Sequence, residues 1–182
     1  MSVTKKVLSA KGLEFIQKLF SLDWGPIAFK LTHPDGEGLT YRQAGVAIAK
    51  YMAFLLLIYL FPQAKIVPTR EIDLVWHNHV LDTSKYAEDC QELFGHFVHH
   101  YPYFGLLDES DRQKLEVAFT QTQVLFKEHL GIDIAAGELL ADTSQTPADC
   151  EPLKEEDVAA KIRPRVDLEI PQELILWGDR LV

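Results

Sequence analysis

The chain has 182 residues, of which 47% are hydrophobic and 25% charged, and 18 Lys and Arg against 27 Asp and Glu give a formal net charge of −9. This length suits one domain with a real hydrophobic core, and ten Gly and nine Pro exclude collagen-like and low-complexity chains. Binding to the phosphates of a nucleic acid requires clustered Lys and Arg. The net negative charge therefore argues against nucleic acid as a partner.

Cysteine content and the N-terminal residues indicate the compartment. The two cysteines, Cys90 and Cys150, are too few for a disulfide framework. Residues 1–20 lack the basic start, the continuous apolar run and the small-residue cleavage site of a signal peptide. Both observations predict a reduced, cytoplasmic protein.

The first forty residues predict one helix followed by a loop. Apolar residues at three- and four-residue spacing predict an amphipathic helix over residues 9–22. Residues 23–38 are rich in Gly, Pro, Asp and His, a composition that is typical of a loop.

Residues 40–61 are expected to form the central helix. Thr40 and Gln43 have the spacing of a capping box, and Pro62 disfavours helix at the residue before it. The uninterrupted apolar stretch covers only residues 51–61, with Lys50 just before it. A membrane span requires about 20 apolar residues, so the length favours a buried core helix over a transmembrane helix. We therefore do not expect membrane association.

The next helical stretch covers residues 69–94. Thr69 is the expected N-cap, and Gly95 is the expected left-handed C-cap. A helix of about 25 residues is long for a globular domain, so we expect a break near residues 82–84.

An aromatic, irregular segment follows over residues 96–107 and leads into another helix. Ser110 and Gln113 predict a second capping box at the start of this helix, and Gly131 is its expected stop. No segment has the alternating β-branched pattern of a strand. The fold is therefore predicted to be all-α, with about five to seven helices around the central one.

Composition divides the chain into three parts. Residues 1–131 are expected to form the helical core domain, and residues 132–166 an acidic connector with little periodicity. Residues 167–182 regain aliphatic side chains and a Trp, so we expect them to dock on the core.

Five of the seven histidines lie between residues 77 and 100. Side chains at i and i+2 are about 200° apart on a helix, so His77 and His79 cannot hold the same ligand from a regular helix. Asp73 lies one turn before His77, a spacing at which a carboxylate can orient an imidazole. His79 falls on a stripe that has the spacing of a core-facing helix surface and consists of Ile72, Val75 or Trp76, His79, Thr83, Tyr86 and Cys90.

Two interpretations of this cluster compete. In the first, a divalent metal such as zinc or non-haem iron is bound by some of the residues Asp73, His77, His79, His99 and His100. The side chains expected to surround that pocket are Trp76, Asp82, Thr83, Tyr86 and Cys90. In the second, the histidines only fix helix packing in a scaffold domain that binds a protein partner.

Two further features have alternatives of their own. Cys90 with a nearby His can form a thiolate nucleophile, although free Cys more often packs as a small hydrophobe. The aromatic segment 99–104 either closes over a pocket, bringing His99 or His100 to the helix that carries His77, or fills space between helices.

Three motifs together carry a family resemblance. They are the residues Asp73, Trp76, His77 and His79, the downstream pair Tyr86 and Cys90, and the segment His99-His100-Tyr101-Pro102. These elements resemble the glycine-rich-domain-containing-protein-like family, a domain found in bacteria and plants. The resemblance covers about residues 67–105, and it implies a domain type without an established activity. The Gly-rich tail that names the family has no counterpart in these 182 residues.

Overall fold

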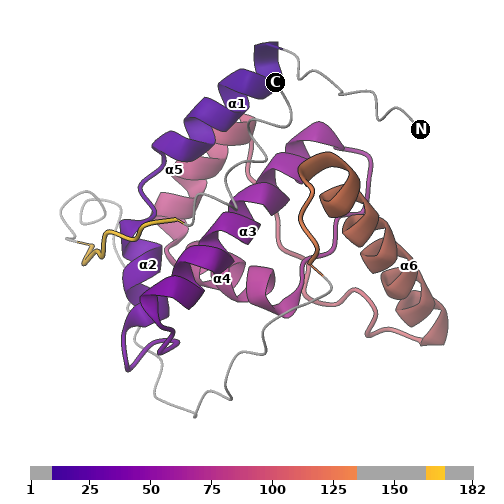
Figure 1. Cartoon of the computed structure of the whole chain (residues 1–182). Helices are drawn as coiled ribbons and strands as arrows, with labels where there is room; N and C mark the ends of the chain where they lie inside the picture. Colours follow the sequence, from indigo (N-terminus) through magenta and orange to yellow (C-terminus); the bar gives the residue numbers. More distant parts are fainter. Residues whose placement is uncertain (1–9, 135–162, 171–182) are drawn as a thin grey trace.

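The computed structural model describes residues 10–134 and 163–170, and within these ranges it contains six α-helices, one π-helical turn and no strand (Figure 1). The predicted all-α class is confirmed. The elements in chain order are α1 Ala10–Ser21, α2 Gly25–Thr32, α3 Tyr41–Leu60, α4 Arg70–Leu81, α5 Thr83–Phe94, α6 Glu109–Leu125 and the π-helical turn η1 Phe126–Leu130.

The central element is α3, and α1, α2 and α4 all pack against it (Figure 1). Its start is the predicted capping box, in which the Thr40 side chain accepts from the Gln43 amide and the Gln43 side chain accepts from the Thr40 amide. By length and composition α3 could cross a membrane, but 67% of its most apolar window is buried within the protein. A core helix passes the same test, so the prediction of a buried central helix is consistent with the structure.

The prediction of a loop over residues 23–38 is wrong, because α2 occupies Gly25–Thr32. Pro26 lies in the first turn, where its missing N–H costs no helical hydrogen bond. The Asp23 side chain accepts from the Gly25 amide at 3.0 Å. Ile27 and Leu31 are buried, and their packing stabilises a helix of only two turns whose composition alone indicates a loop.

The predicted break in the second helical stretch is confirmed. Residue Asp82 separates α4 from α5, and its carboxylate caps α5 by accepting from the Lys85 amide. Thr69 is the N-cap of α4, and Gly95 ends α5 with a φ of 73°, as predicted. The break turns α5 away from the axis of α4, so the two helices pack against each other.

The start of α6 differs from the prediction. Its N-cap is Asp108, whose carboxylate accepts from the Asp111 amide at 2.8 Å, so Ser110 lies inside the first turn and forms no capping box. Asp is as good an N-cap as Ser, and Asp108 is the residue with extended backbone. The predicted stop at Gly131 is confirmed, with a φ of 69° after the π-helical turn η1.

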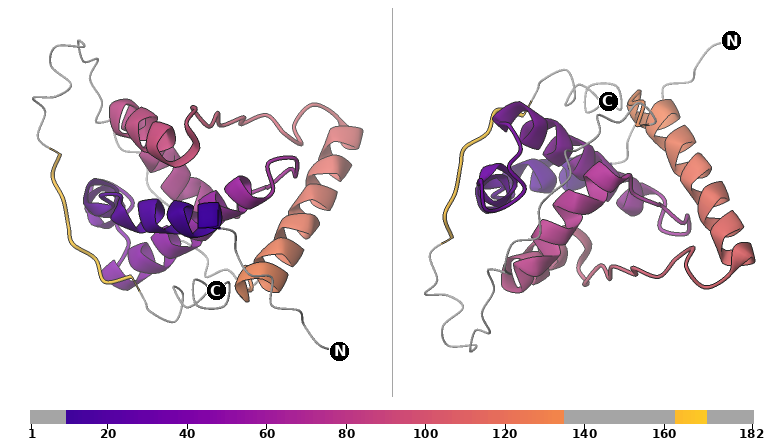
Figure 2. Two further views of the ribbon diagram at one scale, coloured as in Figure 1. Left: turned by 90° about the horizontal axis from the view of Figure 1, so that it is seen from above. Right: turned by 90° about the horizontal axis from the view of Figure 1, so that it is seen from below.

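The α6 helix stands beside the other helices instead of between them (Figure 2). Its buried residues are Ala118 and Thr122, and η1 adds Phe126 and Leu130. The Thr122 hydroxyl accepts from the Val67 amide at 2.9 Å, which ties α6 to the α3–α4 connection. Contact with the core is therefore concentrated at the C-terminal end of this helix.

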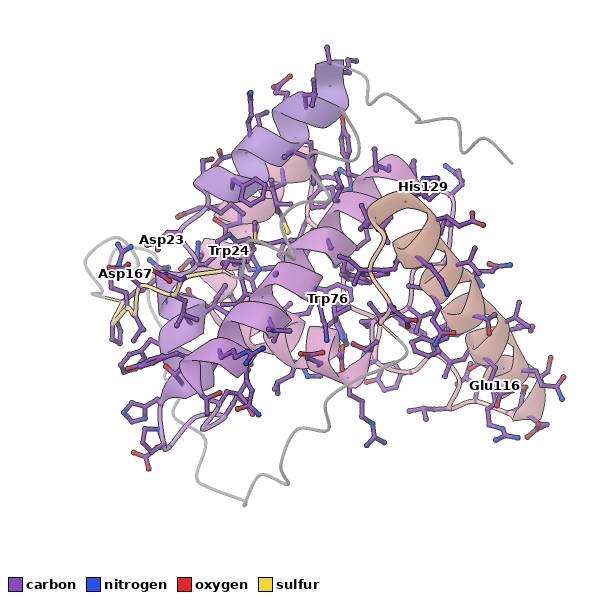
Figure 3. The ribbon with its side chains drawn as sticks, in the orientation of Figure 1. Asp23, Trp24, Trp76, Glu116, His129 and Asp167 are labelled. Carbon is purple, nitrogen blue, oxygen red and sulfur yellow. The ribbon has the colours of Figure 1, made fainter. Side chains whose placement is uncertain are left out.

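Residues 163–170 run along the surface near the α1–α2 junction. The Val166 amide donates to the Gly25 carbonyl at 3.1 Å, and Arg165 lies 3.2 Å from the Asp23 carboxylate. Figure 3 shows Asp23, Trp24 and Asp167 on the same side of the molecule. The rest of the predicted acidic connector, from residue 135, and the end of the predicted C-terminal segment, from residue 171, lie outside the described residues.

Candidate functional site

Three of the predicted ligands come together on the surface of α4. Asp73 and His77 lie one turn apart on this helix, and His100 reaches them from the segment after α5. One potential ligand atom from each residue lies within 4.8 Å of the other two. We call Asp73, His77 and His100 the surface His–Asp cluster.

The carboxylate of Asp73 contacts both imidazoles, one through each oxygen. His100 Nε2 lies 2.9 Å from Asp73 Oδ1, and His77 Nε2 lies 3.7 Å from Asp73 Oδ2. The two imidazole rings are 4.7 Å apart between centroids. Because the side chain of His77 is 52% exposed and that of His100 only 15%, the cluster has one open side and one side formed by the protein.

Trp76 forms much of the closed side. Its ring lies 4.5 Å from that of His100 in an edge-on arrangement and 5.3 Å from that of Phe54 on α3. Trp76 is buried and is labelled in Figure 3. The cluster therefore lies directly outside the hydrophobic core.

His79 does not join this cluster, and it lies in a second, buried network. Its Nδ1 is 3.0 Å from the Tyr51 hydroxyl on α3, and its Nε2 is 2.8 Å from Asp89 Oδ2 on α5. Lys85 Nζ also donates to Asp89 Oδ2, at 2.7 Å. As the helical geometry predicts, His77 and His79 face different surroundings, with His79 only 1% exposed.

Burial determines the charge state of this second network. It lowers the pKa of His79, and the hydrogen bond that His79 donates to Asp89 opposes that shift without cancelling it. Burial alone would raise the pKa of Asp89, but hydrogen bonds from His79 and Lys85 lower it below its usual value. In this network the His79 imidazole is therefore neutral, and the charge of the Asp89 carboxylate is balanced by Lys85.

The other predicted residues have separate positions. His99 is exposed, and its ring lies beside that of Phe97 at a tilt of 52°, with 4.9 Å between ring centroids. Asp82 accepts two hydrogen bonds from the Arg163 guanidinium, at 2.5 and 3.0 Å. Thr83, the first residue of α5, is exposed and does not line the cluster.

Tyr86 and Cys90 are buried beside the segment that leads to His100. The Tyr86 hydroxyl accepts from Trp76 Nε1 at 2.9 Å and donates to the Val98 carbonyl at 2.5 Å. Burial raises the pKa of the Cys90 thiol, despite hydrogen bonds with Val98 and Tyr86. A thiol with a raised pKa is a poor nucleophile, so the thiolate alternative gains no support.

Sequence reasoning missed the charged groups inside the core. Lys50 on α3 donates to Glu71 on α4 at 2.6 Å, and the two side chains are 11% and 10% exposed. Asp89 and Lys85 are not among the predicted site residues either. A lone Lys within an apolar helix is a signal that a buried carboxylate is needed, because an unpaired charge in a core is strongly unfavourable.

The donor set of the surface cluster suits a divalent transition metal. Two imidazoles and one carboxylate match zinc and non-haem iron, and three protein ligands leave a position for water or substrate. Ligands about 2.0–2.1 Å from a tetrahedral zinc are about 3.3 Å apart. In the structure the three candidate ligand atoms, one from each residue, lie within 4.8 Å of one another, and the separations of 2.9 Å and 3.7 Å from Asp73 involve its two different oxygens.

The molecule is thus an all-α domain with a His–Asp cluster at its surface, and comparisons with known proteins assign its family. The chain belongs to the UCP032817-like family, whose sequence model matches residues 20–123. It is 33% identical over 92 residues to glycine-rich domain-containing protein 1 and 35% identical over 89 residues to glycine-rich domain-containing protein 2, both from Arabidopsis thaliana. These findings confirm the glycine-rich-domain-like resemblance.

The matched regions are short relative to the two plant proteins. Each alignment covers 47% of this chain but only 11% of the relative. No solved structure matches the chain.

Proposed function

We propose that this domain binds a divalent transition metal ion through Asp73, His77 and His100. The observation that carries the proposal is the convergence of one carboxylate and two imidazoles, from two separate segments, within 4.8 Å. Two of these residues lie on a helix anchored in the core, which holds them in a fixed relation.

Zinc and iron(II) are the metals that this donor set favours. Imidazole with one carboxylate is a borderline-soft set that suits both, whereas magnesium and calcium prefer oxygen ligands. The open side at His77 leaves room for a water or a small ligand to complete the coordination. Metal binding would require both imidazoles to be neutral, so affinity should decrease in acid.

The test is a metal titration of protein that is expressed without a His-tag and treated with a chelator. We expect saturable binding of one equivalent of zinc or, under anaerobic conditions, of iron(II), and no comparable binding of magnesium. His77→Ala removes a ligand and should weaken the affinity by more than about 100-fold, which is the upper range for losing only an outer-shell partner. Competition with a chromophoric chelator measures the affinity.

His99 offers a matched control, since it is a neighbouring, exposed imidazole that does not join the cluster. His99→Ala should leave the affinity within about twofold of the unmodified protein, well short of the 10-fold lower limit for an outer-shell loss. Absence of saturable zinc or iron binding, or equal losses for His77→Ala and His99→Ala, would contradict the proposal.

A protein-binding role is the second candidate, and the exposed side chains after the cluster favour it. Tyr101, Tyr103, Leu106 and Leu107 are all at least 58% exposed, within one short segment. Exposed apolar side chains grouped in this way are typical of interaction surfaces. The two roles differ in one measurement: replacing Leu106 and Leu107 with Ser should leave metal affinity unchanged and abolish association with a protein partner.

A further inference from the structure

The surface His–Asp cluster depends on a residue that lies outside any helix. Asp73 and His77 are fixed by α4, but His100 belongs to the irregular segment between α5 and α6. A metal site requires its ligands to be held close to the correct geometry. The contacts that fix this segment therefore determine whether the third ligand is available.

One such contact is a buried hydrogen-bonded chain that ends two residues before His100, at the Val98 carbonyl. Trp76 Nε1 donates to the Tyr86 hydroxyl at 2.9 Å, and that hydroxyl donates to the Val98 carbonyl at 2.5 Å. Tyr86 is 1% exposed, so water does not compete for these bonds. The chain joins α4, α5 and the backbone that leads to His100.

Trp76 strengthens this connection because its indole contacts both Tyr86 and His100. The same indole that donates to Tyr86 packs edge-on against the His100 ring, at 4.5 Å between centroids. The Tyr86 hydroxyl thus fixes the plane of Trp76 and the position of Val98 at once. Both elements border His100.

We propose that Tyr86 is a positioning residue for metal binding, which holds His100 at the surface His–Asp cluster through the Val98 carbonyl and the Trp76 indole. The inference rests on the proposed function, since it concerns the same metal site. Tyr86 itself does not contact the metal in this proposal.

The protonation of Tyr86 is consistent with this role. Burial raises the pKa of the Tyr86 hydroxyl far above its ordinary value, and the hydrogen bond from Trp76 opposes that shift only in part. The hydroxyl is therefore protonated at neutral pH and has a proton to donate to Val98.

Tyr86→Phe tests the proposal, because it removes only the hydroxyl and retains the ring. We expect zinc affinity, measured by chelator competition on the full chain, to fall by about 10- to 100-fold, the usual effect of losing an outer-shell partner of a metal ligand. Cobalt(II) substitution gives a second readout: the visible absorption spectrum of the variant should change in shape or intensity, because a displaced His100 alters the coordination geometry.

Tyr51→Phe is the matched control. Tyr51 is also a buried Tyr with a hydroxyl bonded to another side chain, but its partner is His79, outside the surface cluster. Tyr86→Phe loses two buried hydrogen bonds and Tyr51→Phe loses one, so both variants should be destabilised, Tyr86→Phe somewhat more. Only Tyr86→Phe should weaken zinc binding and alter the cobalt spectrum.

Each outcome has a distinct meaning. If the unmodified protein binds no metal, the proposed function fails, and this inference fails with it. If the unmodified protein binds zinc and Tyr86→Phe binds it equally well, or both Tyr variants weaken binding equally, the positioning role alone is overturned. Should Tyr86→Phe not fold, Trp76→Phe removes the donor at the other end of the chain, and unchanged affinity in that variant would overturn the proposal.

Discussion

His79 has partners on both ring nitrogens, and their chemistry fixes its protonation. Ionised Asp89 can only accept, so His79 Nε2 carries the proton that it donates, and the Tyr51 hydroxyl donates to Nδ1. The ring is then neutral, in agreement with its lowered pKa. Protonation at Nδ1 would break the bond from Tyr51 inside the core.

This arrangement predicts a loss of stability in mild acid. The pKa of His79 is lowered in the folded protein relative to about 6.5 in the unfolded chain, so below pH 6.5 the unfolded chain binds a proton that the folded protein does not. The free energy of unfolding should fall by up to about 1.4 kcal/mol per pH unit from this group. Urea unfolding at pH 7.5 and pH 5.5 measures the change.

His79→Gln separates this effect from the titration of the exposed histidines. Glutamine cannot be protonated, so the variant should lose less stability than the unmodified protein over the same pH interval. An identical pH dependence in both proteins would show that His79 does not contribute. Asp89 adds a further loss only in stronger acid, because its pKa is lowered and its stabilisation disappears as it becomes protonated.

For single residues, the sequence predicts which face of a helix a side chain occupies better than it predicts which residue that side chain contacts. Helical spacing correctly separates His77 from His79 and places Tyr86 and Cys90 with His79 on the buried side. Thr83 has the same spacing but is exposed, because it is the first residue of α5, directly after the break at Asp82. Which of His99 and His100 meets Asp73 depends on the path of an irregular segment, which has no period to follow.

Among the helices, the α3–α4 contact contains an unusual pair. Lys50 and Glu71 form an ion pair with both side chains about nine-tenths buried. Two charges removed from water gain little net stability together, but either one alone is strongly unfavourable. The pair therefore fixes the relation between the core helix and the helix that carries Asp73 and His77.

Glu71→Gln should destabilise the domain by about 3–5 kcal/mol, because it leaves the Lys50 ammonium buried without a counter-charge. The double variant Lys50→Met, Glu71→Leu should recover most of that loss, since apolar side chains of similar volume suit the site. Urea unfolding of the two variants provides the measurement. Equal destabilisation in the single and double variants would contradict the assignment of a paired buried charge.

The predictions for whole helices succeed where a helix has capping residues and a long apolar face. Thr40 and Thr69 begin helices at the predicted residues, and Gly95 and Gly131 end them. The α2 helix was missed because its eight residues, GPIAFKLT, begin with two residues typical of turns. Its helical state depends on burial against α3 and α4, which local sequence does not encode.

For the whole molecule, the burial of α3 determines whether the protein should partition into water or into detergent. We expect the protein to remain in the aqueous phase during detergent phase separation, because most of the apolar surface of α3 is already covered by other helices. Recovery in the detergent phase would contradict this expectation and favour the transmembrane alternative. The predicted cytoplasmic location and the absence of a nucleic-acid partner remain predictions.

The peripheral attachment of α6 has a consequence for how this domain can diverge. Among the described residues of its body, Ala118 and Thr122 are buried and Leu125 packs against the core, and the π-helical turn joins its end to the interior. Most positions along its outer surface can therefore accept new side chains at little thermodynamic cost. Related domains could acquire different recognition surfaces on this one helix while the arrangement of Asp73, His77 and His100 stays intact.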